Sequence, residues 1–261
     1  PRKLEGRGEM KRLKNFFKDY WITALIILLM VMSYKYISDR KLISPMMFPN
    51  IGLIGKAFYD NRQNALINVA SSFQLLAPSI LITLVLALGI GFLMGLHEKL
   101  RKVLYPIVYA FSCVPSILLS PFVVLLSPSM WWASIIMIVY GCVWATLFAT
   151  ITGIQTIDKR YLDNAATLEL RGWKRFIRVI LPAASPAILA GFVNSLRSSF
   201  VMLVYAEMYG AQYGLGFYVK RYSTLGIYEN VWGGFLFMVF ILIIVMTIFE
   251  KIKNHILRWA M

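Results

Sequence analysis

The sequence has few of the residues from which catalytic and metal sites are built. Its 261 residues include two histidines, two cysteines and only 12 aspartates and glutamates. Cys113 and Cys142 both lie inside apolar stretches, which argues against a disulfide framework or a metal-ligand cluster. The sequence contains no Ser/His/Asp or paired-carboxylate constellation and no G-x-x-x-x-G-K-[ST] phosphate loop. We therefore predict no catalytic residue, no metal ligand and no cofactor bound by this chain.

Charge is also scarce, and apolar residues are in excess. Charged residues make up 15% of the chain and hydrophobic residues 59%, against about 25% and roughly 45–50% in an ordinary soluble domain. A compact cytosolic enzyme would need more polar surface than this, so we expect lipid to cover the chain.

Uncharged apolar runs indicate how the chain crosses the membrane, because a bilayer core needs about 20 apolar residues in helical form. The first run is longer than the apolar region of a signal peptide and lacks a small-residue cleavage site, so we expect it to be a true span. The sequence predicts an all-α integral membrane protein with six transmembrane helices: Tyr20–Ile37, Leu75–Leu96, Val103–Leu126, Met130–Ile151, Leu181–Ala206 and Val231–Phe249.

The placement of Lys and Arg predicts the orientation, because positively charged loops stay on the cytoplasmic side. With both termini inside, 19 of the 27 basic residues are cytoplasmic, seven are outside and Arg197 lies within a span. This asymmetry accounts for the net charge of +15 without a nucleic-acid partner. We expect a basic cytoplasmic segment over 1–19, a single transmembrane domain over 20–250 and a cytoplasmic tail over 251–261.

The third predicted span contains Pro106, Pro115 and Pro121. Proline removes a backbone donor and clashes with the preceding turn, so this helix should be kinked or broken. Freed carbonyls persist in a membrane only beside protein or a water-filled cavity. With Ser112 and Ser116 close by, the pattern favours a helix lining a pathway, although proline is also common in ordinary membrane helices.

The fifth predicted span carries polar groups near its middle. A charge such as Arg197 is costly within a membrane, and Asn194 and Ser198 lie beside it. These residues, with Ser112, Pro115, Ser116 and Glu207, are the candidate lining of a translocation pathway. The alternative is that Arg197 pairs with a carbonyl or carboxylate between helices.

In the second span, Gly91 and Gly95 form a G-x-x-x-G pair that predicts close helix packing.

The loop over 153–180 reads as two short amphipathic helices. Asp158 can cap the first, Gly172 allows a turn, and apolar residues then recur at helical spacing. So many apolar residues in a loop indicate that the loop has a partner. The small residues Ala165 and Ala166 permit close packing, which favours docking to another protein. The alternative is a helix lying on lipid head groups.

Within this loop, Asp163-Asn-Ala-Ala-Thr-Leu168 followed by Val179-Ile-Leu-Pro182 resembles the EAA signature of permease subunits in bacterial ABC importers. That signature reads EAA, three residues, Gly, nine residues, I-x-L-P. Asn164 replaces its first alanine and Glu169 its glycine, so we expect Gly172 to make the turn instead. The stretch Ala206-Glu-Met-Tyr-Gly-Ala-Gln-Tyr-Gly-Leu-Gly216 is similar to the nitrate, sulfonate and taurine class of these permeases.

The resemblance implies a MetI-like core of five helices, here preceded by one extra helix, that works as a symmetric homodimeric pair in the bacterial cytoplasmic membrane. It implies two partner ATPase subunits that hold ATP and Mg²⁺ and bind the coupling loop. The coupling residues implied are Asp163, Asn164, Ala165, Ala166, Leu168, Glu169 and Gly172. It also implies an extracytoplasmic solute-binding protein that docks on 38–74 and 207–230.

The expected function is import of a small polar or anionic solute by alternating access, with nitrate, sulfonate, taurine or a heterocyclic vitamin precursor as candidates. Two alternatives come from other classes, namely a membrane-embedded enzyme and a structural subunit of another complex. The scarcity of histidine and of carboxylates within the spans argues against the enzyme.

Overall fold

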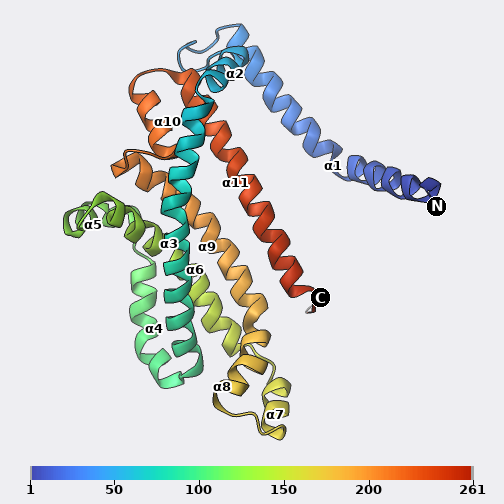
Figure 1. Cartoon of the computed structure of the whole chain (residues 1–261), viewed down its shortest axis with the longest axis vertical. Coiled ribbons are helices and arrows are strands. Elements are labelled where there is room, and N and C mark those ends of the chain that lie inside the picture. The colour runs from blue at the N-terminus through green and yellow to red at the C-terminus, as the bar shows by residue number, and fades with distance from the viewer. Residues whose placement is uncertain (1, 260–261) are drawn as a thin grey trace.

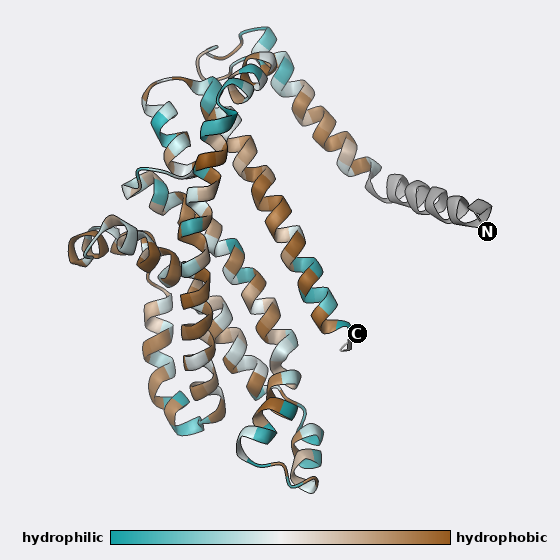
Figure 2. Ribbon diagram, viewed as in Figure 1, coloured by the Kyte–Doolittle hydropathy of each residue, from teal (hydrophilic) through white to brown (hydrophobic). Residues whose placement is uncertain are grey.

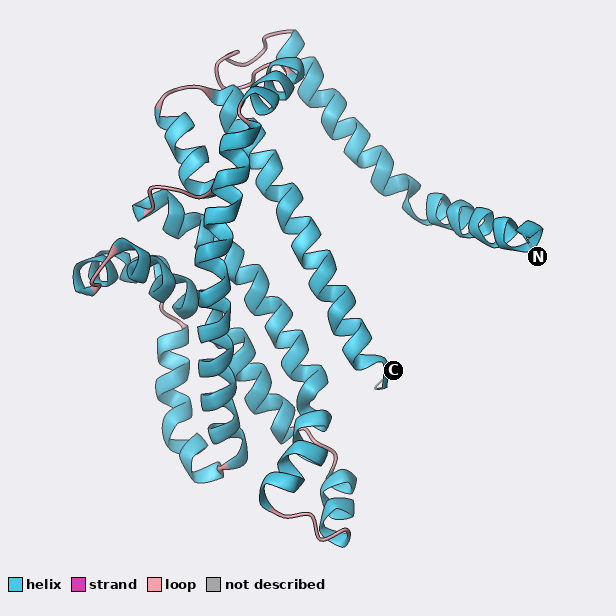
Figure 3. Cartoon of the chain, viewed as in Figure 1, coloured by secondary structure: helices cyan, strands magenta, loops and turns pink. Residues whose placement is uncertain are grey.

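The computed structural model describes residues 2–259, and within them every regular element is a helix (Figures 1 and 3). Five of these helices are long and apolar enough to cross a membrane. In chain order the elements are α1 (Arg2–Asp39), α2 (Ile51–Asp60), α3 (Arg62–Leu96), α4 (Glu98–Ser112), η1 (Ser116–Leu119), α5 (Ser120–Leu126), α6 (Met130–Gln155), α7 (Lys159–Thr167), α8 (Gly172–Arg175), η2 (Phe176–Ile180), α9 (Leu181–Gly210), α10 (Leu215–Thr224), α11 (Tyr228–Ile256) and η3 (Leu257–Trp259).

The centre of the fold is a three-helix unit in which α6 packs against both α3 and α9. Small residues let the helix backbones approach closely. A Cβ added at Gly91 of α3 would lie 2.7 Å from the Thr150 Cβ of α6, and Gly191 of α9 faces Ala149 of α6 with no room for a side chain. Gly95 likewise faces Ile154. The packing predicted for Gly91 and Gly95 is therefore confirmed.

Buried hydroxyl and thiol groups fasten the same three helices. Ser195 Oγ of α9 donates to the Cys142 carbonyl of α6 at 2.5 Å and accepts from the Thr146 backbone N–H at 3.1 Å. On the other side of α6, Cys142 Sγ lies 3.2 Å from Thr83 Oγ1 of α3. Apolar packing alone gives little preference for one helix neighbour over lipid, so these polar contacts help to fix the partners.

The third predicted span is not one straight helix. α4 ends at Ser112, and the segment Ser116–Leu126 that follows is bent by 83° relative to it. The break falls at Pro115, which has no backbone N–H to continue the ladder, and Pro121 occupies the first turn of α5, where proline is tolerated. The proline pattern predicted this break, and the six expected crossings become five continuous helices and one bent pair.

Helix α1 joins the bundle only near its C-terminal end, and its apolar side chains from Trp21 onward are exposed (Figures 1 and 2). Tyr34 Oη donates to the Pro49 carbonyl and Trp232 Nε1 donates to the Met47 carbonyl, both at 2.9 Å. The Tyr34 and Trp232 rings meet edge to face, with centroids 5.3 Å apart. This cluster ties the end of α1 to the start of α11.

The two ends of the bundle differ in structure (Figure 1). Helices α7 and α8 and the turn between α3 and α4 lie at one end, which we call the loop end. Helices α2 and α10 and the first turns of α11 lie at the other, which we call the α10 end. The predicted coupling residues lie at the loop end, and Glu207 lies toward the α10 end.

Candidate coupling loop and polar groups of the bundle

The loop over 153–180 folds as the sequence predicts, into two short helices. Asp158 caps α7, because its Oδ1 accepts from the Arg160 backbone N–H at 2.9 Å. The Arg160 guanidinium also binds Asp158 Oδ2 at 2.6 Å. These hydrogen bonds lower the pKa of Asp158, and the bond from the Arg160 side chain contributes more than the one from its backbone N–H. The start of the loop therefore has a fixed conformation that cap chemistry explains.

The end of α7 corrects one expectation. Leu170 N–H donates to the Ala165 carbonyl at 2.9 Å and Glu169 N–H to the Ala166 carbonyl at 3.0 Å, which is the paired bonding of a Schellman motif. Glu169 occupies its left-handed position with φ of +50°, a conformation that ordinarily favours glycine. Gly172 is also left-handed, with φ of +52°. Gly172 thus makes a second turn, and Glu169 makes the first despite its side chain.

Aromatic contacts hold the second half of the loop to the bundle. The Phe176 ring stacks on Trp173 and meets Phe92 of α3 edge to face, with centroids 5.2 and 4.9 Å apart. η2 runs without interruption into α9. Force applied to the loop would therefore reach α3 and α9 through packed side chains and a continuous helix.

The predicted coupling residues divide by exposure. Ala165 is 1% exposed, so its small side chain serves packing within this chain. The others lie on the surface of the loop: Asp163, Asn164, Ala166, Leu168, Glu169 and Gly172. Leu168 and Trp173 are 71% and 72% exposed, and with the exposed Tyr161 they give the loop apolar side chains on its surface. This surface is the part of the loop that a partner could bind.

The residues predicted to line a pathway in the broken span do not converge on one site. Ser112 Oγ donates to the Tyr109 carbonyl of its own helix at 2.7 Å. Pro115 is exposed at the break. Ser116 is buried, and its Oγ donates to Met202 Sδ of α9 at 3.0 Å. In this conformation Ser116 therefore fastens the break to the bundle.

Arg197 forms an interhelical pair. Its Nη2 lies 3.3 Å from Glu250 Oε1 of α11, and its Nη1 lies 3.5 Å from Asn194 Oδ1. The Arg197 and Glu250 side chains are 59% and 48% exposed, and Ser198 is partly exposed beside them. In the structure Arg197 therefore pairs with a carboxylate between helices, which was one of the two alternatives that the sequence left open.

Glu207 is packed inside the bundle at 1% exposure. Its Oε2 accepts from the Gly216 backbone N–H at 2.7 Å, and a Cβ on Gly214 would overlap its carboxyl group. Gly214 is left-handed, with φ of +120°. Glu207 thus holds the turn between α9 and α10. Gly214 is required because its backbone approaches the Glu207 carboxyl so closely, and Gly216 because a Cβ there would lie 2.5 Å from the Val204 carbonyl oxygen.

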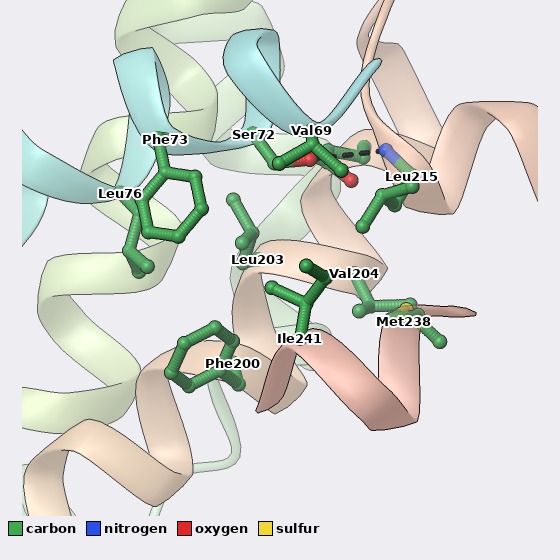
Figure 4. Close-up of a pocket in the computed structure, with 11 residues that line it drawn as sticks. Val69, Ser72, Phe73, Leu76, Phe200, Leu203, Val204, Leu215, Met238 and Ile241 are labelled. Carbon is green, nitrogen blue, oxygen red and sulfur yellow. Dashed lines mark hydrogen bonds between the residues drawn. The ribbon is translucent and has the colours of Figure 1, made fainter. Parts of the chain in front are cut away.

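The same turn is fastened to α3. Gly214 N–H donates to Asn68 Oδ1 at 2.8 Å, and Leu215 N–H donates to Ser72 Oγ at 3.0 Å. Figure 4 shows Ser72 and Leu215 joined beside apolar side chains of α3, α9 and α11. The polar groups of this region therefore bind the turn, and the cavity next to them is lined almost entirely by hydrocarbon.

A larger cleft of about 400 Å³ opens on the other side of Glu207, at the α10 end. It lies between α3, the start of α6 and the α9–α10 turn, and its polar lining is Glu207 itself with Ser71, Gln74, Ser129, Ser134, Gln212 and Tyr213. Sequence reasoning found Glu207 and missed the other six. The spacing of Ser71 and Gln74 by three on one face of an apolar helix was the available signal. Among the described residues, no group of three His, Cys, Asp or Glu could hold a metal ion.

Comparison with known proteins places this geometry in a family. The chain is 28% identical over 151 residues to the nitrate import permease protein NrtB of Leptolyngbya laminosa, covering 58% of this chain and 54% of that protein. It is 26% identical over 174 residues to the putative aliphatic sulfonates transport permease protein SsuC of Bacillus subtilis, covering 67% of this chain and 63% of that one. The chain thus spans less than two thirds of these relatives' lengths.

A third relative matches over more of its length. The formylaminopyrimidine transport permease protein ThiX of Halalkalibacterium halodurans is 21% identical over 235 residues, covering 90% of this chain and 94% of that protein.

Solved structures share the fold at low sequence identity. An inward-facing structure of the MetNI methionine ABC transporter has a TM-score of 0.63 at 16% identity, covering 75% of this chain and 97% of that chain. A bacterial ABC transporter involved in the import of alginate has a TM-score of 0.62 at 15% identity, covering 94% and 99%. The MetI-like fold predicted from the sequence is therefore confirmed.

The family match covers most of the chain. Residues 86–260 match the binding-protein-dependent transport system inner membrane component, a stretch that begins in α3 and includes the broken span, the loop over 153–180 and the α9–α10 turn. The chain belongs to the family of binding-protein-dependent transport system inner membrane components.

Proposed function

We propose that this chain is the permease subunit of an ATP-driven importer for a small polar or anionic solute. The observation that carries the proposal is the loop over 153–180 in a chain of this family. It is an ordered pair of helices with an exposed apolar surface, and it is joined without a break to α9. An exposed apolar surface on an ordered element is typical of a docking site.

The proposed mechanism is alternating access driven from the loop end. Two partner ATPase subunits hold ATP and Mg²⁺, and each receives one loop in a surface groove. Closure of the ATPase pair on ATP pulls the two loops together, and the contacts of Phe176 with α3 and of η2 with α9 pass this motion to the bundle. Hydrolysis of ATP reverses the motion. The chain itself supplies no catalytic residue.

The proposal includes three further features: a second copy of the chain, a solute-binding protein and an orientation in the membrane. A second copy of the chain completes the pathway as a homodimer in the bacterial cytoplasmic membrane. An extracytoplasmic solute-binding protein docks at the α10 end, on 38–74 and 207–230, and releases solute near the cleft beside Gln74 and Gln212. The loop end and both termini face the cytoplasm, in keeping with the excess of basic residues there.

The class of solute is supported by the relatives and by the cleft. The names of the relatives give nitrate, aliphatic sulfonates, bicarbonate and formylaminopyrimidine as their solutes. All four are small and polar. The cleft offers hydroxyl and amide groups that can hydrogen-bond such solutes.

The test is reconstitution of the chain with its ATPase and solute-binding protein in proteoliposomes. Uptake of labelled nitrate, taurine, bicarbonate and an aminopyrimidine should occur for one of them, only with ATP, and only with the binding protein present. The variant Leu168→Asp should lose uptake and capture of the ATPase because it places a charge in the docking surface. Leu225→Asp, at an exposed leucine of the α10 end, should keep capture of the ATPase. Uptake without an ATPase would contradict the proposal.

A further inference from the structure

Within residues 2–259, three helices end in the same Schellman geometry. The residues at their left-handed positions are Lys41 after α1, Glu169 after α7 and Gly226 after α10, with φ of +51°, +50° and +74°. In each case this residue donates to a carbonyl three residues back, and the next residue donates to a carbonyl five residues back. A lysine, a glutamate and a glycine thus occupy the same left-handed position, so only their side chains differ.

Local chemistry explains two of the three. Gly226 has no Cβ and takes a left-handed conformation without strain. Lys41 bears a Cβ, but its positive charge lies at the C-terminus of α1, where the helix dipole favours a cation. Glu169 has neither advantage. Its Cβ disfavours the conformation, and its negative charge lies at the negative end of α7, which has no basic residue in its last turn.

No ion pair or side-chain hydrogen bond among the described residues offsets these penalties. The Glu169 side chain is exposed, and none of the ion pairs or side-chain hydrogen bonds among the described residues includes its carboxylate. Arg171, two residues further on, does not pair with it. Leu168 directly precedes Glu169 and Trp173 follows four residues later, and both of these apolar side chains are exposed. A strained, unpaired charge within a docking surface points to a partner group absent from this chain.

We propose that Glu169 determines which ATPase subunit this chain accepts, by pairing with a lysine or arginine in the groove that receives the loop. This inference rests on the proposed function. Docking would bury Leu168 and Trp173 around the pair and remove water from it, which strengthens a matched charge pair and penalises an unmatched one. An ATPase without a basic residue at that point would leave the carboxylate buried and unpaired.

The test measures the affinity of full-length chain in lipid nanodiscs for the ATPase subunit that co-purifies with it. Glu169→Gln keeps the size of the side chain without its charge, while Glu169→Asn and Glu169→Gly also relieve the backbone. Lys41→Gly is the matched control, since it relieves the same strain at the other end of the bundle. We expect the three Glu169 variants to bind at least about tenfold more weakly, and Lys41→Gly to bind like wild type.

Loss of the carboxylate charge and damage to the loop would both weaken binding, and the unfolding temperatures of the variants separate these two causes. Glu169→Gly and Lys41→Gly should both raise the unfolding temperature, so a loss of affinity in the first alone cannot come from a damaged loop. Pairing Glu169→Lys with a charge-reversed basic residue of the groove should restore affinity. Wild-type affinity in Glu169→Gly or Glu169→Asn would overturn the inference while leaving the proposed function intact. Failure of the wild-type chain to bind any ATPase would overturn both.

Discussion

At the scale of single residues, Glu207 acts as a structural acceptor for the α9–α10 turn. Glu207→Ala removes the acceptor of the Gly216 N–H and leaves a cavity beside Gly214. We expect it to lower the free energy of unfolding by about 2–4 kcal/mol, from an unpaired buried donor and lost packing. Glu207→Gln should cost less, because its amide oxygen can still accept the bond. Unfolding of the purified chain in detergent, followed by circular dichroism, measures both.

Ser112→Ala is the control for this prediction, since its hydroxyl binds only a carbonyl of its own helix. It should leave stability close to that of the wild type. If Glu207→Ala unfolded like wild type while solute uptake disappeared, Glu207 would belong to the pathway, as the sequence pattern suggested, and its bond to Gly216 would be secondary.

Sequence reasoning at this scale found the notable polar residues but not their partners. Arg197 and Glu207 stand out because charges within apolar runs are costly. Their partners, Glu250 and Gly216, are set by how α9 meets α11 and the following turn. The left-handed Glu169 was hidden for another reason, because a glycine three residues later offered a simpler place for the turn.

At the scale of elements, two glycines of α3 allow a matched test of helix packing. Gly91 faces Thr150 of α6 closely, whereas nothing lies within 4 Å of a Cβ placed on Gly89. We expect Gly91→Leu to separate α3 from α6 and to destabilise the chain by several kcal/mol, on the order of 3 or more, because the overlap is with backbone-proximal atoms. Gly89→Leu should be tolerated. Thermal unfolding and monodisperse yield report the difference, and equal behaviour of the two variants would contradict this packing.

The ion pair between α9 and α11 gives a second prediction at this scale. A double-mutant cycle of Arg197→Ala and Glu250→Ala should show a coupling free energy of about 1 kcal/mol, typical of a partly exposed pair. The coupling is obtained from the unfolding free energies of the wild type, both single variants and the double variant. Additive effects would mean that α11 is held to α9 by packing alone, for example by the Phe192–Phe249 ring contact.

The long elements were predictable, and the short ones were not. Apolar runs located the five continuous spans, three prolines located the break after α4, and Asp158 located the start of α7. The 83° bend itself depends on Ser116 and its neighbours packing on α6 and α9, which no local pattern encodes. Helices α2 and α10 are only ten residues each, too short to stand out as spans in the sequence.

At the scale of the whole molecule, the central question is which end of the bundle faces the cytoplasm. The basic residues favour the loop end, and only a cytoplasmic loop could meet an ATPase. The chain suits a labelling test because it has two cysteines, of which Cys113 is exposed and Cys142 is buried. Replacing Cys113 by serine leaves one thiol that a bulky reagent should not reach.

Single cysteines can then be placed at the exposed Trp173 of the loop end and at Lys56 of the α10 end. In intact cells, a membrane-impermeant maleimide should label Lys56→Cys and not Trp173→Cys, and in inside-out vesicles the pattern should reverse. Addition of the ATPase subunit to those vesicles should then protect Trp173→Cys, since docking buries the apolar surface around it. Labelling of Trp173→Cys from outside intact cells would place the loop on the wrong side of the membrane for any ATP-driven motion.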